Sequence, residues 1–246
     1  MLSVNHLNKA FGKLVVTDNV SLQVAKGERR VILGPNGAGK TTLFNLLVGE
    51  LGANSGEILL NGQNISSMNI EQRARLGLAR SYQKNNLFDA LTVRENLALS
   101  CANTMGLSYS LWNQPAKNAI LQEDIEQIAV QVSLQDHLDD TVEHISYGNR
   151  RQLEVGLALA CKPSVLLMDE PTSGVGPSMI TGFNHLLHSL PKDLTVIIVE
   201  HDMDLAFSIA DNITVLSYGK IVFEGTPSQT RESELVNEIY LGTWDA

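Results

Sequence analysis

The feature that most constrains this chain is a glycine-rich octapeptide at residues 34–41. It reads Gly-Pro-Asn-Gly-Ala-Gly-Lys-Thr and fits the pattern G-x-x-x-x-G-K-[ST]. A short apolar run at residues 30–33 precedes it, and residues 41–51 carry leucines at helical spacing. A glycine-rich turn between a buried strand and a helix is the context in which this pattern binds phosphate. We therefore predict a phosphate-binding loop (P-loop) at this junction.

The loop supplies the groups that nucleotide phosphates need. Glycines let successive backbone N–H groups point inward, and a helix that begins near Lys40 directs its positive end at the anion. Lys40 can reach the β- and γ-phosphates, and the Thr41 hydroxyl can hold Mg²⁺. The alternative is a glycine-rich turn that caps an ordinary helix. The residues of the predicted loop are Gly34, Pro35, Asn36, Gly37, Ala38, Gly39, Lys40 and Thr41.

A second signal lies at residues 165–170, where an apolar run ends in two adjacent carboxylates, Asp169 and Glu170. Neighbouring side chains on a strand point in opposite directions, so the two acids should have different roles. Asp169 is suited to a Mg²⁺ site, directly or through water, and Glu170 is suited to polarising an attacking water as general base. The alternative is a strand-end turn with two solvated acids.

Two further polar residues follow predicted strands. Gln83 comes after residues 79–82, and His201 comes after residues 195–200. Gln83 could bind Mg²⁺ or the attacking water, and His201 could donate to the γ-phosphate. Taken singly, a glutamine or histidine in such a place is more often an ordinary surface or core polar residue.

The order of the expected elements predicts an α/β fold. Residues 1–25 indicate short antiparallel strands with a turn near residues 11–13, and residues 213–216 and 220–223 indicate a terminal strand pair. Strands alternating with helices favour a largely parallel sheet. Residues 85–161 have few β-branched runs and are expected to form a helical insertion.

Composition excludes several classes of protein. Of the 246 residues 43% are hydrophobic and 18% charged, which is typical of a globular chain. Two cysteines cannot form a disulfide scaffold, and no apolar run approaches the ~18–20 residues of a membrane span. No secretory signal is expected at the N-terminus. The net charge of −9 disfavours nucleic acid as a partner.

Together these motifs resemble the ATP-binding subunit of an ABC (ATP-binding cassette) transporter, in the expected order over nearly all of residues 1–246. Within the resemblance Phe11 matches the aromatic residue that stacks on adenine, Thr42 extends the P-loop motif, and Gln83 matches the Q-loop. Residues 145–149, with Ser146 and Gly148, match the signature motif. Residues 173–176 match the D-loop, and His201 matches the switch histidine.

The resemblance implies a P-loop NTPase cassette with a mostly parallel core sheet, N-terminal antiparallel strands and a helical subdomain at 85–161. It implies ATP and Mg²⁺ as cofactors, Glu170, His201, Lys40 and Gln83 in catalysis, and Thr41, Gln83 and Asp169 around the metal. It also implies head-to-tail pairing, as a homodimer or a heterodimer, in which Ser146 and Gly148 complete the other subunit's ATP site.

The finer resemblance is to the branched-chain amino-acid (LivG-like) importers, whose signature also carries a tyrosine before its glycine. It implies a cytoplasmic protein, peripheral on the inner face of the membrane. Separate integral membrane permease subunits would pass a small solute, an amino acid, amide or urea-like molecule, delivered by a solute-binding protein.

The chain departs from the family pattern at two positions. The signature ends in Asn149 in place of glutamine, and Gly176 stands where the D-loop usually has Asp or Asn. One alternative function is therefore a soluble ATP-dependent switch with weak hydrolysis; another is a cassette ATPase that acts on the ribosome or DNA. Arg150 and Arg151 are interpreted as a solvated helix face.

Overall fold

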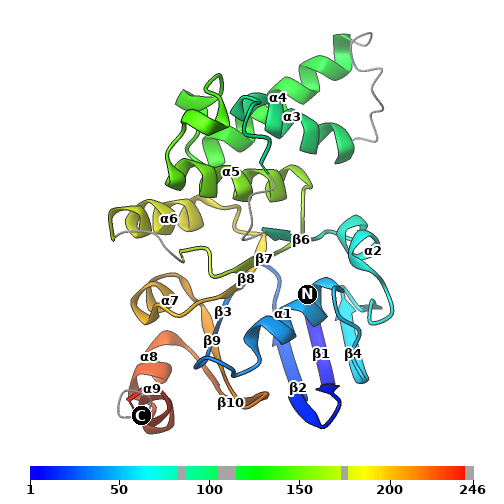
Figure 1. The fold of residues 1–246 in the computed structure, drawn as a ribbon, viewed down its shortest axis with the longest axis vertical. Helices are drawn as coiled ribbons and strands as arrows, with labels where there is room; N and C mark the ends of the chain where they lie inside the picture. The colour runs from blue at the N-terminus through cyan, green and yellow to red at the C-terminus, as the bar shows by residue number, and fades with distance from the viewer. Residues whose placement is uncertain (82–86, 105–114, 173–176, 242–246) are drawn as a thin grey trace. The chain divides into compact units, whose positions relative to one another are not determined.

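The computed structural model describes residues 1–81, 87–104, 115–172 and 177–241 (Figure 1). The chain divides into two compact units. The first comprises residues 1–78, 164–171 and 192–246, and the second comprises residues 79–163 and 172–191. Gln83 and residues 173–176, both singled out in the sequence, lie outside the described residues. Within the described ranges no helix is long and apolar enough to cross a membrane.

The first unit begins with an antiparallel sheet, as predicted. It consists of β1 (Leu2–Phe11), β2 (Leu14–Val24), β4 (Ser55–Leu60) and β5 (Gln63–Asn64), in the order β2-β1-β4-β5. The turn between β1 and β2 falls at Gly12, inside the predicted turn.

The core sheet of this unit is mostly parallel, which also confirms the prediction. Its strands are β3 (Arg29–Leu33), β7 (Val165–Asp169), β8 (Thr195–Val199), β9 (Asn212–Ser217) and β10 (Lys220–Gly225). They lie in the order β10-β9-β3-β8-β7, and only β10 runs antiparallel to its neighbour. Every residue of β7 and β8 is buried, the pattern of a parallel sheet that is covered on both faces. A further strand, β6 (Leu78–Ser81), begins at the end of this unit.

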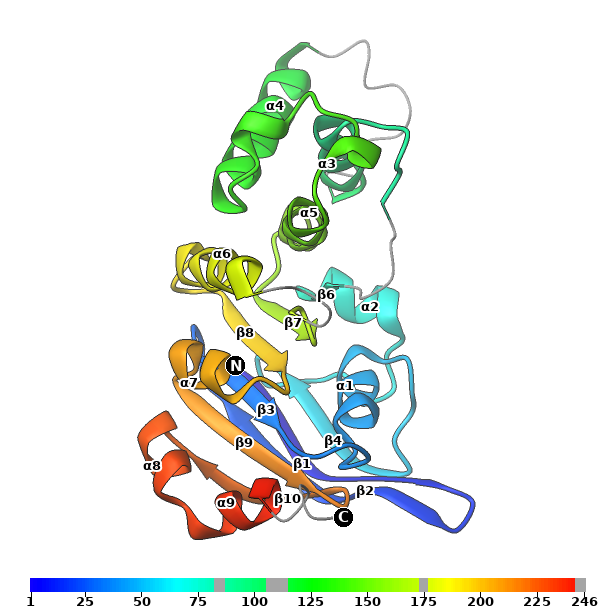
Figure 2. The same cartoon turned by 60° about the vertical axis from the view of Figure 1, so that its left-hand side comes forward.

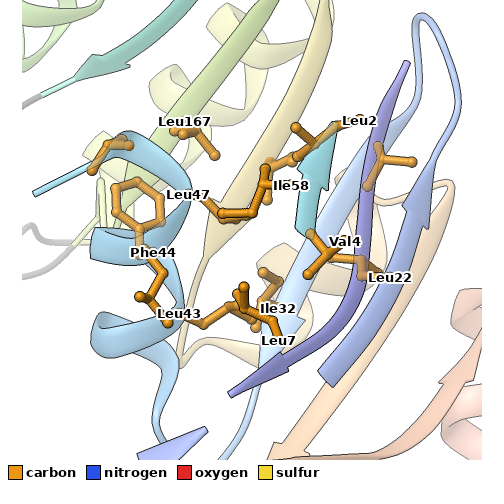
Figure 3. Close-up of a cluster of buried hydrophobic side chains, with 14 of the residues drawn as sticks. Leu2, Val4, Leu7, Leu22, Ile32, Leu43, Phe44, Leu47, Ile58 and Leu167 are labelled. Carbon is orange, nitrogen blue, oxygen red and sulfur yellow. The ribbon is translucent and has the colours of Figure 1, made fainter. Parts of the chain in front are cut away.

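Helix α1 (Lys40–Val48) lies in the main hydrophobic core of the first unit. Figure 3 shows Leu43 and Leu47 of α1 among side chains from the strands, including Leu2 and Ile58. Leu43 and Leu47 are fully buried and lie one helical turn apart, so they share one face of α1. The helix that follows the P-loop is thereby fixed to both sheets.

A buried arginine fixes the other end of α1. Arg73, in α2 (Ile70–Arg75), donates from Nη1 to the carbonyl oxygens of Leu46 (2.6 Å) and Leu47 (2.7 Å). Its Nε also donates to the Met68 carbonyl, at 2.9 Å. The last carbonyls of a helix lack hydrogen-bond donors within the helix, and the partial negative charge of the helix dipole lies at this end. The Arg73 guanidinium therefore supplies both the missing donors and a compensating positive charge.

Three helices complete the described part of the first unit. Their bounds are α7 (Met203–Ile209), α8 (Pro227–Glu232) and α9 (Glu234–Leu241). Figures 1 and 2 show α8 and α9 beside β10, and α8 contacts both β9 and β10. The turn between β9 and β10 is made by Tyr218 and Gly219, both at positive φ, as expected for a two-residue hairpin loop.

The second unit is helical. Its helices are α3 (Val93–Thr104), α4 (Pro115–Gln131), α5 (Tyr147–Ala160) and α6 (Pro177–Ser189), with short 3₁₀ turns at Gln135–His137 and Val142–His144. Figure 2 shows α3, α4 and α5 grouped together. A Cβ on Gly156 of α5 would lie 3.2 Å from Leu97 and 3.4 Å from Ile128, so a small residue is needed where the three helices meet. The subdomain limits of 85 and 161 stay a prediction.

Candidate nucleotide-binding site

The P-loop has a backbone that requires glycine at its turn into α1. Gly39 has φ of 101°, and a Cβ there would lie 2.5 Å from the Val16 carbonyl oxygen. Gly34 is equally confined, because a Cβ added at this position would lie 2.4 Å from the Leu216 carbonyl oxygen. The pattern glycines are therefore needed for close backbone approach as well as for φ.

Neighbouring backbone holds the loop from outside. The Gly219 N–H donates to the Ala38 carbonyl (2.9 Å), and the Asp18 N–H donates to the Gly219 carbonyl (2.8 Å). The β9–β10 turn thus links the P-loop to β2. A phosphate cradle that is shaped before ligand binds loses less entropy on binding.

Lys40 is the cation of this loop. Its side chain is 5% exposed, and Nζ donates to the carbonyls of Gly34 (2.6 Å) and Pro35 (3.1 Å). Burial lowers the pKa of Lys40, while the nearby carboxylates of Glu170 and Asp169 raise it. The predicted lysine and the two predicted acids therefore lie within electrostatic reach of one another.

The two acids occupy different environments, as alternation along a strand predicts. Asp169 is the last residue of β7 and is 5% exposed, whereas the side chain of Glu170 is 24% exposed. Glu170 has φ of 45°, a left-handed conformation that costs a non-glycine residue about 1 kcal/mol or more. The N–H of Glu170 donates to the Val199 carbonyl at 2.8 Å, which fixes this turn.

His201 lies against Glu170, with His201 Nε2 in contact with Glu170 Oε1. The register of β7 and β8 explains this contact, because Asp169 pairs with Val199 in parallel. Residues just beyond two parallel strands in register emerge at the same edge of the sheet. The His201 side chain is 44% exposed, so it is open to a ligand on one side.

The structure describes three further predicted residues. Phe11 ends β1 with half of its surface exposed, and the Lys9 ammonium lies 5.2 Å from its ring centroid. Thr41 is exposed in the first turn of α1. Ser146 is the N-cap of α5 in the second unit, where its hydroxyl accepts from the Asn149 N–H at 3.2 Å.

The interpretation of Arg151 as part of a solvated helix face is wrong. Its side chain is 13% exposed, and its Nη1 donates to Glu154 Oε2 at 2.7 Å. Glu154 is itself 9% exposed. The Arg150 side chain is also mostly covered, at 22% exposed, and it pairs with the half-exposed Asp89 at 3.0 Å. The sequence signal was the i, i+3 spacing of Arg151 and Glu154 together with the apolar character of the rest of α5.

Comparison with known proteins identifies the family of this chain. Residues 17–173, well over half of the chain, match the ABC transporter family. The chain belongs to the ABC transporter family. It is an ATP-binding cassette, and cassettes of this family hydrolyse ATP to power transport.

The curated relatives of this cassette include proteins named for branched-chain amino acid transport and proteins named for lipopolysaccharide export. It is 34% identical to the high-affinity branched-chain amino acid transport ATP-binding protein LivG of Escherichia coli K12, over 98% of both chains. It is 32% identical to the lipopolysaccharide export system ATP-binding protein LptB of Acidithiobacillus ferridurans, over 98% of this chain and 97% of LptB.

The fold also matches a solved cassette. A crystal structure of the ADP conformation of an ATP-binding cassette of an ABC transporter superposes with a TM-score of 0.83 at 28% identity. The match covers 98% of each chain. The α/β cassette fold expected from the sequence is therefore confirmed.

Proposed function

We propose that this cassette energises the import of a small solute, an amino acid, amide or urea-like molecule, by hydrolysing Mg-ATP. The observation that carries the ATPase part is the convergence of four side chains in the first unit. Lys40 lies within the electrostatic reach of Asp169 and Glu170, and His201 contacts Glu170. A cation, two acids of different exposure and a histidine beside a P-loop are the groups that phosphoryl transfer to water needs.

We assign each of these residues a separate role in ATP hydrolysis. Lys40 and the loop N–H groups bind the β- and γ-phosphates and offset their charge. Glu170 accepts a proton from the attacking water while the water oxygen bonds to the γ-phosphorus and the bond to the ADP oxygen breaks. His201 keeps the Glu170 carboxylate in place and donates a hydrogen bond to the γ-phosphate.

The oxygen donors fit magnesium. Thr41 and Asp169 offer a hydroxyl and a carboxylate, the hard ligands that Mg²⁺ prefers, and we assign Gln83 to the same shell. When bound, Mg²⁺ would neutralise charge on the phosphates. We assign adenine to the exposed ring of Phe11, because a planar base can stack on its free surface.

Pairing of two cassettes completes the proposal. Ser146 and Gly148 of α5 would meet the γ-phosphate held by a second cassette, in a homodimer or a heterodimer. The N-terminus of the 14-residue helix α5 favours an anion at that point. Integral membrane permease subunits would be the direct partners, with a solute-binding protein acting through them.

The similarity to LivG supports import. The similarity to LptB, a protein named for export, leaves export as the alternative direction. The two identities, 34% and 32%, are too close to decide direction. The LivG-like signature with Tyr147 favours import of a small solute. We place the cassette in the cytoplasm on the inner face of the membrane, without nucleic acid as a partner, since its net charge is −9.

Transport by the reconstituted complex tests this function. The cassette is co-expressed with candidate permease and solute-binding subunits, and the complex that forms is placed in vesicles with ATP on the cassette side. ATP-dependent movement of labelled leucine, urea or a short-chain amide toward the cassette, absent in Glu170→Gln, is expected. Movement of a lipid-linked solute away from the cassette would contradict import. Hydrolysis that never couples to solute movement would favour the switch, and co-sedimentation with ribosomes or DNA would favour the other alternative.

A further inference from the structure

Helix α9, the last helix that the structure describes, buries one face that ends in a tyrosine hydroxyl. Val236 is fully buried, and Tyr240 lies one helical turn further along, on the same face of α9. The Tyr240 side chain is partly covered, and its hydroxyl oxygen is shielded from solvent. A hydroxyl that water cannot reach needs a hydrogen-bond partner inside the protein.

The partner of this hydroxyl is the first glycine of the P-loop. The Gly34 backbone donates a hydrogen bond to the Tyr240 oxygen. Burial raises the pKa of Tyr240 to about 12, and the hydrogen bond from Gly34 opposes that rise. The phenol therefore stays protonated at physiological pH, and α9 contacts a loop that is far from it in the sequence.

Gly34 is a position at which support from outside the loop matters. Its φ of 156° is one that residues with side chains rarely adopt, and glycine loses more conformational freedom on folding than any other residue. Contacts must offset that loss if the loop is to keep one shape. The Leu216 carbonyl of β9 crowds Gly34 from one direction, and the Tyr240 hydroxyl binds its backbone.

Gly34 in turn holds the lysine of the loop. Lys40 Nζ donates to the Gly34 carbonyl oxygen at 2.6 Å, and the Lys40 side chain is buried. Contacts therefore run from Tyr240 through Gly34 to Lys40, and all three residues belong to the first unit. A loop and a lysine that are already in place lose less conformational entropy when phosphate binds.

Helix α8 anchors α9 against the rest of the first unit. It begins with a capping box, in which the Gln229 N–H donates to the Thr226 hydroxyl and the Thr226 N–H donates to Gln229 Oε1 at 2.9 Å. The guanidinium carbon of Arg231 lies 4.5 Å from the ring centroid of Phe207 in α7, a cation–π contact. Helix α8 also contacts β9, β10 and α9. Tyr240 is thus carried by a fixed support.

We propose that Tyr240 is a positioning residue for nucleotide binding, which holds Gly34, and through it Lys40, in the conformation that accepts the nucleotide phosphates. This inference rests on phosphate binding by the P-loop in the proposed function. Tyr240 acts through the loop backbone and does not itself contact the phosphates. Because linkage is reciprocal, a nucleotide on the loop stabilises the docked position of α9 by the same factor.

The nucleotide affinity of Tyr240→Phe tests this role, because the change keeps the ring and removes only the hydroxyl. Isothermal titration with ADP and with a non-hydrolysable ATP analogue should give dissociation constants about two- to tenfold higher than for the wild type, the usual effect of losing one hydrogen bond. Both nucleotides should be affected, because both place a β-phosphate at Lys40. Tyr218→Phe is the matched control. It removes the same hydroxyl from a side chain that is 91% exposed, and it should bind like the wild type.

Hydrogen exchange separates positioning from packing. In the wild type, ADP should slow the exchange of backbone amides in α9, and most of this slowing should be lost in Tyr240→Phe. A hydroxyl that only packs would change exchange in α9 equally with and without ADP. The amides of α4, in the second unit, are the internal reference for any general effect of ADP. Thermal melting checks that each variant folds.

Each outcome decides a separate point. Equal nucleotide dissociation constants for the wild type and Tyr240→Phe would overturn the role of Tyr240 and leave phosphate binding by the P-loop intact. Weaker binding with the same ADP-dependent slowing in α9 would overturn the positioning role, as would an equal loss of affinity in Tyr218→Phe. A folded wild-type cassette that binds neither nucleotide would overturn the proposed function, and this inference with it.

Discussion

His201 Nε2 contacts Glu170 Oε1 at the ends of two neighbouring parallel strands. The contact joins residues 31 positions apart in the sequence, and it places an imidazole beside the proposed general base. It also accounts for the left-handed backbone of Glu170, because that turn brings the carboxylate back toward β8. The chemistry assigned to this pair yields the first two predictions.

Glu170→Gln should bind ATP but hydrolyse it about 10²–10⁴-fold more slowly, because the amide cannot accept the proton from water. The measurement is phosphate release with Mg-ATP in excess, alongside a nucleotide-binding titration. Turnover at the wild-type rate would remove Glu170 from the role of base. Asp202→Asn, a change at the N-cap of α7, is a control that should retain hydrolysis.

His201→Ala should lose most hydrolysis and keep most nucleotide affinity. The imidazole contacts Glu170 and is assigned a single hydrogen bond to the γ-phosphate, whereas Lys40 and the loop N–H groups supply most of the phosphate binding. Single-turnover phosphate release separates the two effects. His188→Ala, in α6 of the second unit, is the control for removing an imidazole. If His201→Ala turned over normally, the histidine would be a structural residue.

Lys40→Ala should weaken ATP binding by at least about tenfold, since a buried cation aimed at phosphates is lost. Isothermal titration of the variant with ATP and with ADP measures this loss. The loss should be larger for ATP, which has the γ-phosphate. An unchanged affinity would show that the loop does not bind phosphate through Lys40.

Arg73→Met should lower the free energy of unfolding by about 2–4 kcal/mol, because it removes the donors that satisfy the buried carbonyls at the end of α1. Arg75→Met is the matched control. Its guanidinium pairs with Glu71 with both side chains more than 70% exposed, so a change below about 0.5 kcal/mol is expected. Urea denaturation followed by circular dichroism compares them, and equal losses would refute the capping role.

Cys101 should resist thiol reagents in the folded protein. Burial raises the pKa of its thiol to about 11, so at pH 8 it stays protonated, and the thiolate is the reactive form. Cys161 is exposed and should react. Mass spectrometry after maleimide treatment should show one label on the native chain and two after unfolding. Two labels without unfolding would contradict the burial of Cys101.

Local sequence patterns predicted the parts of the site that depend on short spans. The strand, loop and helix around Lys40 and the strand that ends at Asp169 are fixed by glycine spacing and apolar runs within about ten residues. The P-loop motif also correctly located the start of α1.

What the patterns missed depends on distant contacts. Nothing local to Arg73 reveals that its guanidinium caps a helix 26 residues away, and nothing local to Glu170 reveals its positive φ. The register of β7 against β8 decides which residues meet, and register is set by the whole sheet. Arg151 was misjudged for a different reason. Its partners Tyr147 and Glu154 are local, but helical spacing shows which residues share a face and not whether that face is buried.

The most direct test of the account is the solution mass of Glu170→Gln with and without Mg-ATP, measured by light scattering. The account predicts that ATP doubles the mass from the 26.8 kDa of one chain, because two nucleotides join two cassettes. It also predicts that Asn149 and Gly176 do not prevent pairing. A mass that stays at one chain while ATP is bound would contradict the account and favour the soluble switch.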